Sequence, residues 1–363
     1  MSQSKIAVIH LGLHKTGSTS VQHTVSKYAA YLKDHGWLVP KFSFRGKADA
    51  NHSVPLYTLF SGQAQRYHIL TKRGWPLSEA REAFRFQLSE ILSYSGNLLF
   101  SGEDLSRLSP PELIELQSTL VNAGFSVRSI VFVRAPLDTC STTIQQRVKG
   151  GKSITQALSE PSFANGRNVR VLNKLQNTLS SLEIYTFDDV CAGGGPPAFL
   201  IDLLGIPAPV GFSSQNANTS CSMASIRLMS WINQQLPAIG SIGVNPTRSQ
   251  GDLQPLLNLS GSKSALLRDE IAPHLGALKE EQAELQTKWG LSFAKQNCDK
   301  NDFPSEFQWD DQAVDELIPI LPKLTVPIFV RIVDFVYRQY CDQAISEKMY
   351  ATFCAAAHER ARL

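Results

Sequence analysis

Short apolar runs that contain β-branched residues and end at turn residues recur through the first half of the chain. They predict buried strands at Ile6–Leu11, Asn97–Ser101, Ser129–Arg134 and Leu182–Phe187. Between the first two strands, apolar residues at steps of four, three and four predict one face of a helix that ends before Gly36: Val21, Val25, Tyr28 and Leu32.

A second helix is predicted after the strand at Asn97–Ser101. Ser109-Pro-Pro-Glu112 is typical of a helix start, and Leu113, Leu116 and Leu120 then fall on one face. Strands that alternate with helices indicate an α/β fold whose sheet is mostly parallel and flanked by helices.

Strand signals fade after about residue 212. Length and periodicity predict helices at Ala224–Gln235, Ala265–Trp289 and Asp311–Lys323. The segment Cys191–Pro197 is predicted to be a turn, and Gly240–Gly261 a loop or a mobile lid. We therefore expect two domains, an α/β core at 1–210 and a largely helical C-terminal extension at 211–363.

The composition is that of an ordinary globular protein, with 43% hydrophobic and 18% charged residues among 363. The net charge is only +3, so we expect no nucleic-acid partner, and any anion site must be local. Six scattered cysteines favour reduced thiols and a cytoplasmic protein. The most apolar late stretch, Leu317–Tyr340, carries prolines and charges, so no membrane span is expected.

The most informative segment runs from Ile6 to Ser20, where a buried strand passes through a glycine-containing turn into a helix. Such a turn directs backbone N–H groups and the positive end of the helix dipole at one place, which favours an anion. The candidate binding groups are consecutive: Lys15, Thr16, Gly17, Ser18, Thr19 and Ser20. A loop that merely turns the chain is the alternative.

Gly12 and Gly17 have the spacing of a Walker A loop, but Ser18 stands where that loop has lysine. The segment instead resembles the PAPS-dependent sulfotransferase family, whose phosphosulfate loop reads P-K-[ST]-G-[ST]-[ST]; here His14 replaces the proline. The resemblance implies a P-loop-like sulfotransferase core, 3'-phosphoadenosine 5'-phosphosulfate (PAPS) as co-substrate, 3'-phosphoadenosine 5'-phosphate (PAP) as product, and no required metal.

A second segment resembles the 3'-phosphate site of the same family. Arg134 ends a strand, and a hydroxyl residue follows eight positions later at Thr142; Ser141 could serve in its place. An arginine can bind phosphate through two parallel hydrogen bonds. The alternative for Arg134 is a strand end paired with Asp138. The resemblance covers about residues 5–210.

Sulfuryl transfer needs a base for the acceptor proton and a cation for the leaving phosphate. Lys15 is the expected cation. Glu103, at the end of a strand where the family carries a base, is the first candidate base, with an N-terminal helix acid or an Arg107 ion pair as the alternative. His52 is the second candidate, or else a surface residue. His10, His14, His23 and His35 are expected to be structural.

These observations predict a sulfotransferase that acts on a hydroxyl or an amine of a carbohydrate or small-molecule acceptor. Two alternatives stay open: a P-loop-type small-molecule kinase and a non-catalytic nucleotide-binding protein. The segment Arg248-Ser-Gln-Gly251-Asp252 also resembles a late basic loop that closes over the 3'-phosphate in some family members.

Overall fold

The computed structural model describes residues 5–13, 15–160, 166–214, 221–240, 243–249, 251–294 and 299–362. The chain divides into two compact units. The first consists of 1–136, 166–218 and 281–296, and the second of 137–165, 219–280 and 297–363. The sequence predicts one boundary near residue 210, whereas each unit is built from three separate stretches of chain.

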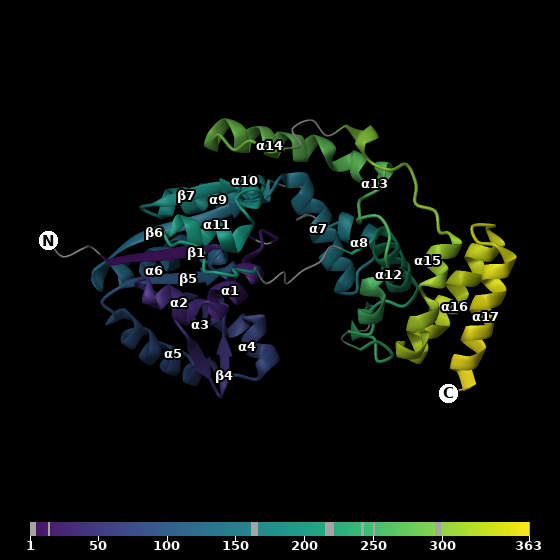
Figure 1. The fold of residues 1–363 in the computed structure, drawn as a ribbon, viewed down its shortest axis with the longest axis horizontal. Helices are drawn as coiled ribbons and strands as arrows, with labels where there is room; N and C mark the ends of the chain where they lie inside the picture. The colour runs from purple at the N-terminus through teal and green to yellow at the C-terminus, as the bar shows by residue number, and fades with distance from the viewer. Residues whose placement is uncertain are drawn as a thin grey trace. The chain divides into compact units, whose positions relative to one another are not determined.

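The first unit is built on a five-stranded parallel sheet in the order β2-β5-β1-β6-β7 (Figure 1). Its strands are β1 Lys5–Leu11, β2 Trp37–Leu38, β5 Asn97–Gly102, β6 Phe125–Val133 and β7 Leu182–Thr186. The middle of the sheet is buried on both faces, which explains why β1, β5 and β6 are nearly continuous apolar runs.

Helices cover both faces of this sheet. On one face pack α1 Ser18–Lys27, α2 Ala29–Asp34, α10 Phe187–Ala192 and α11 Pro196–Leu203. On the other face pack α3 Ser53–Phe60, α5 Leu77–Leu92, α6 Pro110–Asn122 and α9 Arg167–Thr178. The unit also contains α4 His68–Arg73 and a short antiparallel hairpin of β3 Phe42–Phe44 with β4 Lys47–Asp49. The predicted α/β fold class is confirmed.

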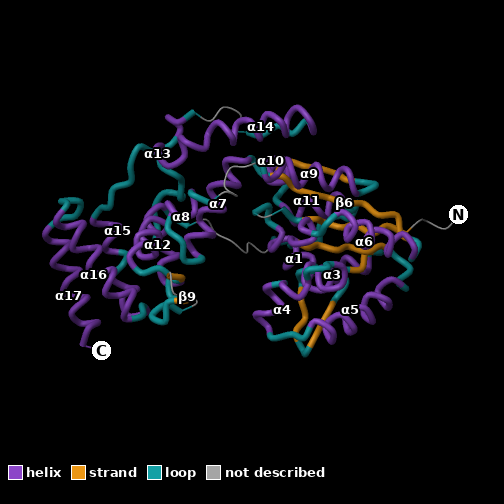
Figure 2. The backbone as a smooth tube through the Cα atoms, turned by 180° about the vertical axis from the view of Figure 1, so that it is seen from behind, coloured by secondary structure: helices purple, strands orange, loops and turns teal. Residues whose placement is uncertain are grey.

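The second unit is mainly helical (Figure 2). Its helices pack around an apolar core of their own. These helices are α7 Pro136–Lys149, α8 Ile154–Leu158, α12 Met223–Gln235, α13 Arg268–Ile271, α15 Asp311–Asp315, α16 Val326–Cys341 and α17 Glu347–Arg362. Strand β8 Ile239–Gly240 pairs antiparallel with β9 Gly243–Val244. Helix α14 Leu275–Trp289 begins in this unit and ends in the first. The helical C-terminal region is thus as predicted.

Several predicted helices are interrupted. The helix predicted at Ala265–Trp289 is α13, a 3-10 turn at Ala272–His274 that contains Pro273, and α14. Asp311–Lys323 is α15 followed by a 3-10 helix at Ile318–Lys323. The predicted loop Gly240–Gly261 contains β9 and a 3-10 helix at Gln254–Asn258. In the described part of the chain, no helix combines the length and the apolar character needed to cross a bilayer.

Candidate functional site: an anion cradle at the end of β1

The loop between β1 and α1 lies at the centre of the sheet's carboxyl edge. Strand β1 ends at Leu11, and α1 begins at Ser18 with Gly17 as its N-cap. The first intrahelical bond runs from the N–H of Val21 to the carbonyl of Gly17 (3.0 Å), so the N-terminal amides of α1 and its positive dipole end face this loop. His14, which replaces the family's proline, lies outside the described residues.

The backbone of this loop is unusual at two positions. Lys15 has φ of 72° although it is not glycine, and Gly17 has φ of 78°. A Cβ atom on Gly17 would also lie 2.6 Å from Cγ of Pro196, the first residue of α11. Gly17 is therefore required both by its left-handed backbone and by the close approach of α11.

The hydroxyl groups of the loop have different partners. Thr16 is buried, and its Oγ1 donates to the carbonyl of Leu13 (2.7 Å), so this side chain braces the turn. Ser18 is also buried, and its Oγ donates to Oε2 of Glu103 (3.0 Å). Thr19 and Ser20 are half-buried in the first turn of α1. The predicted arrangement of strand, turn and helix is therefore confirmed. The sequence did not predict that the Thr16 side chain turns inward.

The two adjacent carboxylates after β5 have different surroundings. Asp104 is buried; its Oδ2 accepts from the Tyr67 hydroxyl (2.9 Å), and its Oδ1 pairs with Arg107 (3.0 Å). Burial and the Asp104 charge together raise the pKa of Tyr67, so that phenol stays protonated and keeps donating. Glu103, in contrast, meets the first turn of α1 through Ser18. Glu103 is thus the carboxylate positioned at the cradle, the candidate anion site at Lys15–Ser20.

Arg134, which follows β6, also reaches the cradle. Its Nη1 donates to the carbonyl of Lys15 (3.0 Å), and its guanidinium lies over the ring of Phe187, 4.8 Å from the centroid. The amide of Asn168 donates to the Arg134 carbonyl (3.4 Å). The structure therefore brings Arg134 and Lys15 together although 119 positions separate them in the sequence. The alternative pairing of Arg134 with Asp138 stays open.

Ser141 and Thr142 lie on α7, in the second unit. The Thr142 hydroxyl donates to the carbonyl of Asp138 (2.9 Å), as hydroxyl side chains within helices often do. The assignment of Ser141 or Thr142 to a 3'-phosphate stays a prediction.

His52 does not have the surroundings of a general base. It is fully buried; its Nε2 donates to the carbonyl of Pro40 (2.7 Å), and its Nδ1 accepts from the N–H of Ser101 (2.8 Å). Burial lowers its pKa to about 4. Both ring nitrogens are therefore used to tie the segment after β2 to β5, and we withdraw His52 as a candidate base. Its position among apolar residues also excludes the surface alternative.

His10 is structural, as expected. Its ring is buried against Phe132 (4.8 Å between centroids), and Nδ1 is hydrogen-bonded to the Ser101 hydroxyl (2.9 Å). Burial lowers the pKa of His10 to about 4. Two neutral histidines therefore meet the same residue of β5.

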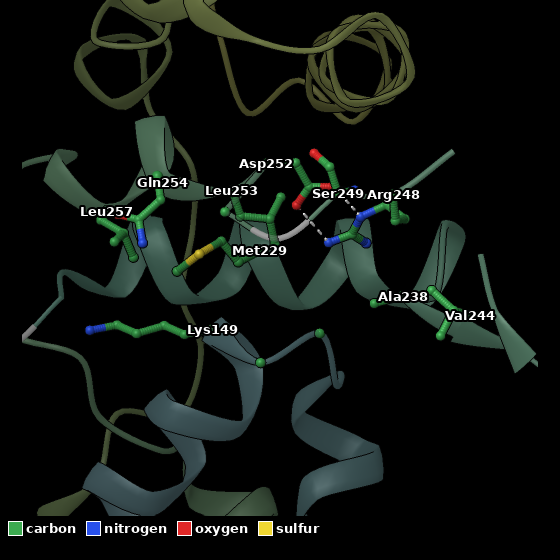
Figure 3. Close-up of a pocket in the computed structure, with 13 residues that line it drawn as sticks. Lys149, Met229, Ala238, Val244, Arg248, Ser249, Asp252, Leu253, Gln254 and Leu257 are labelled. Atoms are coloured by element: carbon green, nitrogen blue, oxygen red, sulfur yellow. Dashed lines mark hydrogen bonds and ion pairs between the residues drawn. The ribbon is translucent and has the colours of Figure 1, made fainter. Parts of the chain in front are cut away.

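Arg248 also differs from its expectation. Within the second unit, its side chain forms a buried ion pair with Asp252 and donates to the carbonyl of Leu236 (2.5 Å) (Figure 3). A guanidinium held in this way has a local bracing role. The resemblance of this segment to a loop that closes over a phosphate is therefore not supported by its contacts.

Sequence reasoning missed the residues that pack around the cradle. Phe187 and Pro196 belong to segments predicted as a strand end and a turn, yet they contact Arg134 and border Gly17. The run Gly193-Gly-Gly-Pro-Pro197 could have indicated this contact. Proline at its end is typical of a helix start, and α11 begins at Pro196, where the chain comes close to Gly17.

Comparison with known proteins gives no functional assignment. No protein-family model matches the chain, and no curated protein matches it. One similar solved chain comes from a molecular and structural characterization of the PezAT chromosomal toxin-antitoxin system of the human pathogen Streptococcus pneumoniae. The match covers 52% of this chain and 69% of that chain, with 15% identity and a TM-score of 0.29, which is too low to bear on function.

Proposed function

We propose that the protein is a PAPS-dependent sulfotransferase that transfers a sulfuryl group to a hydroxyl or an amine of a carbohydrate or small-molecule acceptor. The observation that carries the proposal is the set of groups at one edge of the sheet. The N-terminus of α1 and the loop that contains Lys15 supply an anion cradle. Arg134 contacts that loop, and Glu103 contacts Ser18, the first residue of α1.

The chemistry of this set suits a sulfated nucleotide better than a nucleoside triphosphate. A Walker A lysine would follow Gly17, but Ser18 stands there, and its hydroxyl holds the Glu103 carboxylate. A carboxylate this near the cradle repels additional phosphate charge. A base at this position is instead useful for removing a proton from an acceptor.

In the proposed reaction the acceptor oxygen or nitrogen attacks sulfur and gives its proton to Glu103. The bond between sulfur and the bridging oxygen breaks, that oxygen keeps the electron pair, and PAP leaves. Lys15 and the amides at the start of α1 stabilise the negative charge that grows on the leaving phosphate. Arg134 would hold the 3'-phosphate through the whole reaction, which is uniform binding.

The Ser18 hydroxyl suggests that the donor binds before Glu103 acts as a base. It has one hydrogen, and in the structure this hydrogen goes to Glu103. A phosphate bound at the cradle competes for the same donor. Donor binding would then release Glu103 from Ser18 and make the carboxylate a better proton acceptor when the acceptor molecule arrives.

Nucleotide binding tests the donor assignment. Calorimetry should show that PAP binds more tightly than AMP by about 2 kcal/mol, the scale of hydrogen bonds to a charged group. Arg134→Ala should weaken PAP binding more than AMP binding, so that AMP reports on the cradle itself. Equal affinity for PAP and AMP would refute the 3'-phosphate site, and a clear preference for ATP would favour the kinase alternative.

Turnover distinguishes an enzyme from a non-catalytic nucleotide-binding protein. With labelled PAPS and a panel of sugars and small alcohols and amines, the wild-type chain should release PAP in step with a sulfated product. Lys15→Ala should lower kcat much more than it raises the KM for PAPS, because the lysine faces charge that develops in the transition state. A change in the KM alone would contradict that role.

A further inference from the structure

The second unit contains a pocket of about 390 Å³ that is separate from the residues of the cradle (Figure 3). This volume lies in the range of small-molecule sites. Its apolar lining comes from Met229, Leu253, Leu257, Ala238 and Val244. Its polar lining is sparse, with Lys149, Gln254, Ser249 and the Arg248–Asp252 pair. Apolar walls with a few polar groups are typical of ligand sites.

A buried polar network fixes the walls of this pocket. The Arg248 and Asp252 side chains are only 5% and 4% exposed, and two hydrogen bonds join them, at 2.5 and 3.1 Å. The same guanidinium donates to Oδ1 of Asn233 (3.2 Å). Asn233 in turn donates to the carbonyls of Val148 (2.8 Å), in the last turn of α7, and of Lys152 (3.0 Å), in the segment after it. The network therefore joins the wall formed by α7 to the wall that carries Arg248.

A close backbone approach supports the same arrangement. Gly151 has φ of 99°, and a Cβ atom there would lie 2.6 Å from Cβ of Ala238. Both residues line the pocket. The site is thus held by a satisfied polar network and a glycine contact, so little ordering is needed before a ligand binds.

The charges of the lining select the ligand. Arg248 neutralises Asp252, whereas Lys149 forms no salt bridge with any carboxylate in the described ranges. Lys149 is the last residue of α7, where the helix dipole places a partial negative charge, and the full positive charge of the lysine exceeds it. In Figure 3 the Lys149 amine and the Gln254 side chain lie at the same end of the view, with Met229 and Leu253 between them and the Arg248–Asp252 pair.

We propose that this pocket binds a small anionic amphiphile, with its anionic group at Lys149 and Gln254 and its apolar body along Met229, Leu253 and Leu257. The proposal rests on the second unit alone. It is therefore independent of sulfuryl transfer, and either can fail without the other.

Methionine methyl NMR gives a direct test, because Met229 lines the pocket while Met223, a buried residue of the same helix, does not. With ¹³C-methyl methionine in the full chain, octanoate and octyl sulfate should shift the Met229 signal in a saturable manner and leave Met223 unchanged. Octanol should bind more weakly, and octylamine most weakly. Tighter binding of octylamine, a joint shift of both methyls, or no shift of Met229 would overturn the proposal.

A charge substitution completes the test. Lys149→Gln should weaken octanoate and octyl sulfate about fivefold, the upper range for one exposed ion pair, and leave octanol unchanged. Lys348→Gln removes the same charge from α17 and should change neither. An equal loss for octanoate in both variants, or no loss in Lys149→Gln, would contradict an anion site at Lys149.

Discussion

The hydrogen bond between Ser18 and Glu103 makes an unusual prediction for Glu103→Gln. As the proposed base, Glu103 should contribute about 100- to 10,000-fold to turnover, or roughly 2.7–5.5 kcal/mol of barrier at 1.36 kcal/mol per decade. Glutamine keeps the shape of the side chain but cannot take the proton. Turnover should therefore fall by that factor.

The same substitution should strengthen PAP binding. In the wild-type chain, a phosphate must displace the carboxylate from the Ser18 hydroxyl, at 3.0 Å, and must tolerate its negative charge. A hydrogen bond to a charged group contributes about 1.5–3 kcal/mol when buried, and we take the low end because Glu103 is only half-buried. PAP affinity should therefore rise by about tenfold, since about 1.4 kcal/mol corresponds to a factor of ten.

Calorimetry with PAP measures the affinity and needs no acceptor, and labelled PAPS measures the turnover. Glu115→Gln, an exposed change of the same charge on α6, should alter neither quantity. In a Ser18→Ala background, Glu103→Gln should improve PAP binding less than in the wild-type chain, because the shared hydrogen is gone and only the repulsion by the carboxylate is left to relieve. The base assignment is wrong if Glu103→Gln retains near-normal turnover. The competition between Glu103 and phosphate for the Ser18 hydrogen is wrong if PAP binds Glu103→Gln no more tightly than the wild-type chain.

Two further predictions concern stability. Gly17→Ala should destabilise the protein by about 1 kcal/mol for its left-handed backbone and by a further ~1–3 kcal/mol for the clash with Pro196. Gly46 has φ of 77°, but a Cβ atom there would meet no atom within 4 Å, so Gly46→Ala should show only the backbone cost. Urea denaturation measures both losses, and equal losses would exclude the clash. His10 and His52 have folded-state pKa values of about 4, below the unfolded 6.5, so they stabilise the fold fully above pH 6.5 and lose that contribution as the pH falls toward 4. The unfolding free energy should drop by roughly 3 kcal/mol between pH 7.5 and 5.5, about 1.4 kcal/mol per histidine, and a flat profile would contradict it.

The parts of the fold that local pattern determines could be predicted from the sequence. The predicted strand Asn97–Ser101 is β5 Asn97–Gly102, because a strand buried on both faces is apolar through its middle. Leu182–Phe187 is β7 Leu182–Thr186, an edge strand that is mostly half-buried and is predicted by its β-branched and aromatic residues. The helix interruption at Pro273 also had a local signal, since proline inside a helix removes a hydrogen bond and clashes with the preceding turn. Periodicity alone had hidden it.

The contacts that define the site could not be predicted in the same way. Ser18 and Glu103 are 85 positions apart, so no local pattern could pair them. Whether His52 faces solvent or the core depends on packing from the segment after β2, from β3 and from β5 together. Sequence reasoning could find that two carboxylates end β5. Only the side-chain contacts show that Asp104 is held by Tyr67, so that Glu103 is left as the candidate base.

The bond from Arg134 to the Lys15 carbonyl connects the two halves of the proposed donor site. A left-handed backbone costs a non-glycine residue roughly 1–2 kcal/mol, and Lys15 has this conformation at φ of 72°. The guanidinium of Arg134 offsets part of that cost by holding the Lys15 carbonyl at 3.0 Å. A phosphate that binds Arg134 would therefore also act on the backbone that carries the lysine. In the proposed sulfotransferase, Arg134→Ala should therefore mainly lower donor affinity, through the lost uniform binding of the 3'-phosphate, and should lower kcat by a smaller factor, through the lysine backbone that Arg134 helps to hold.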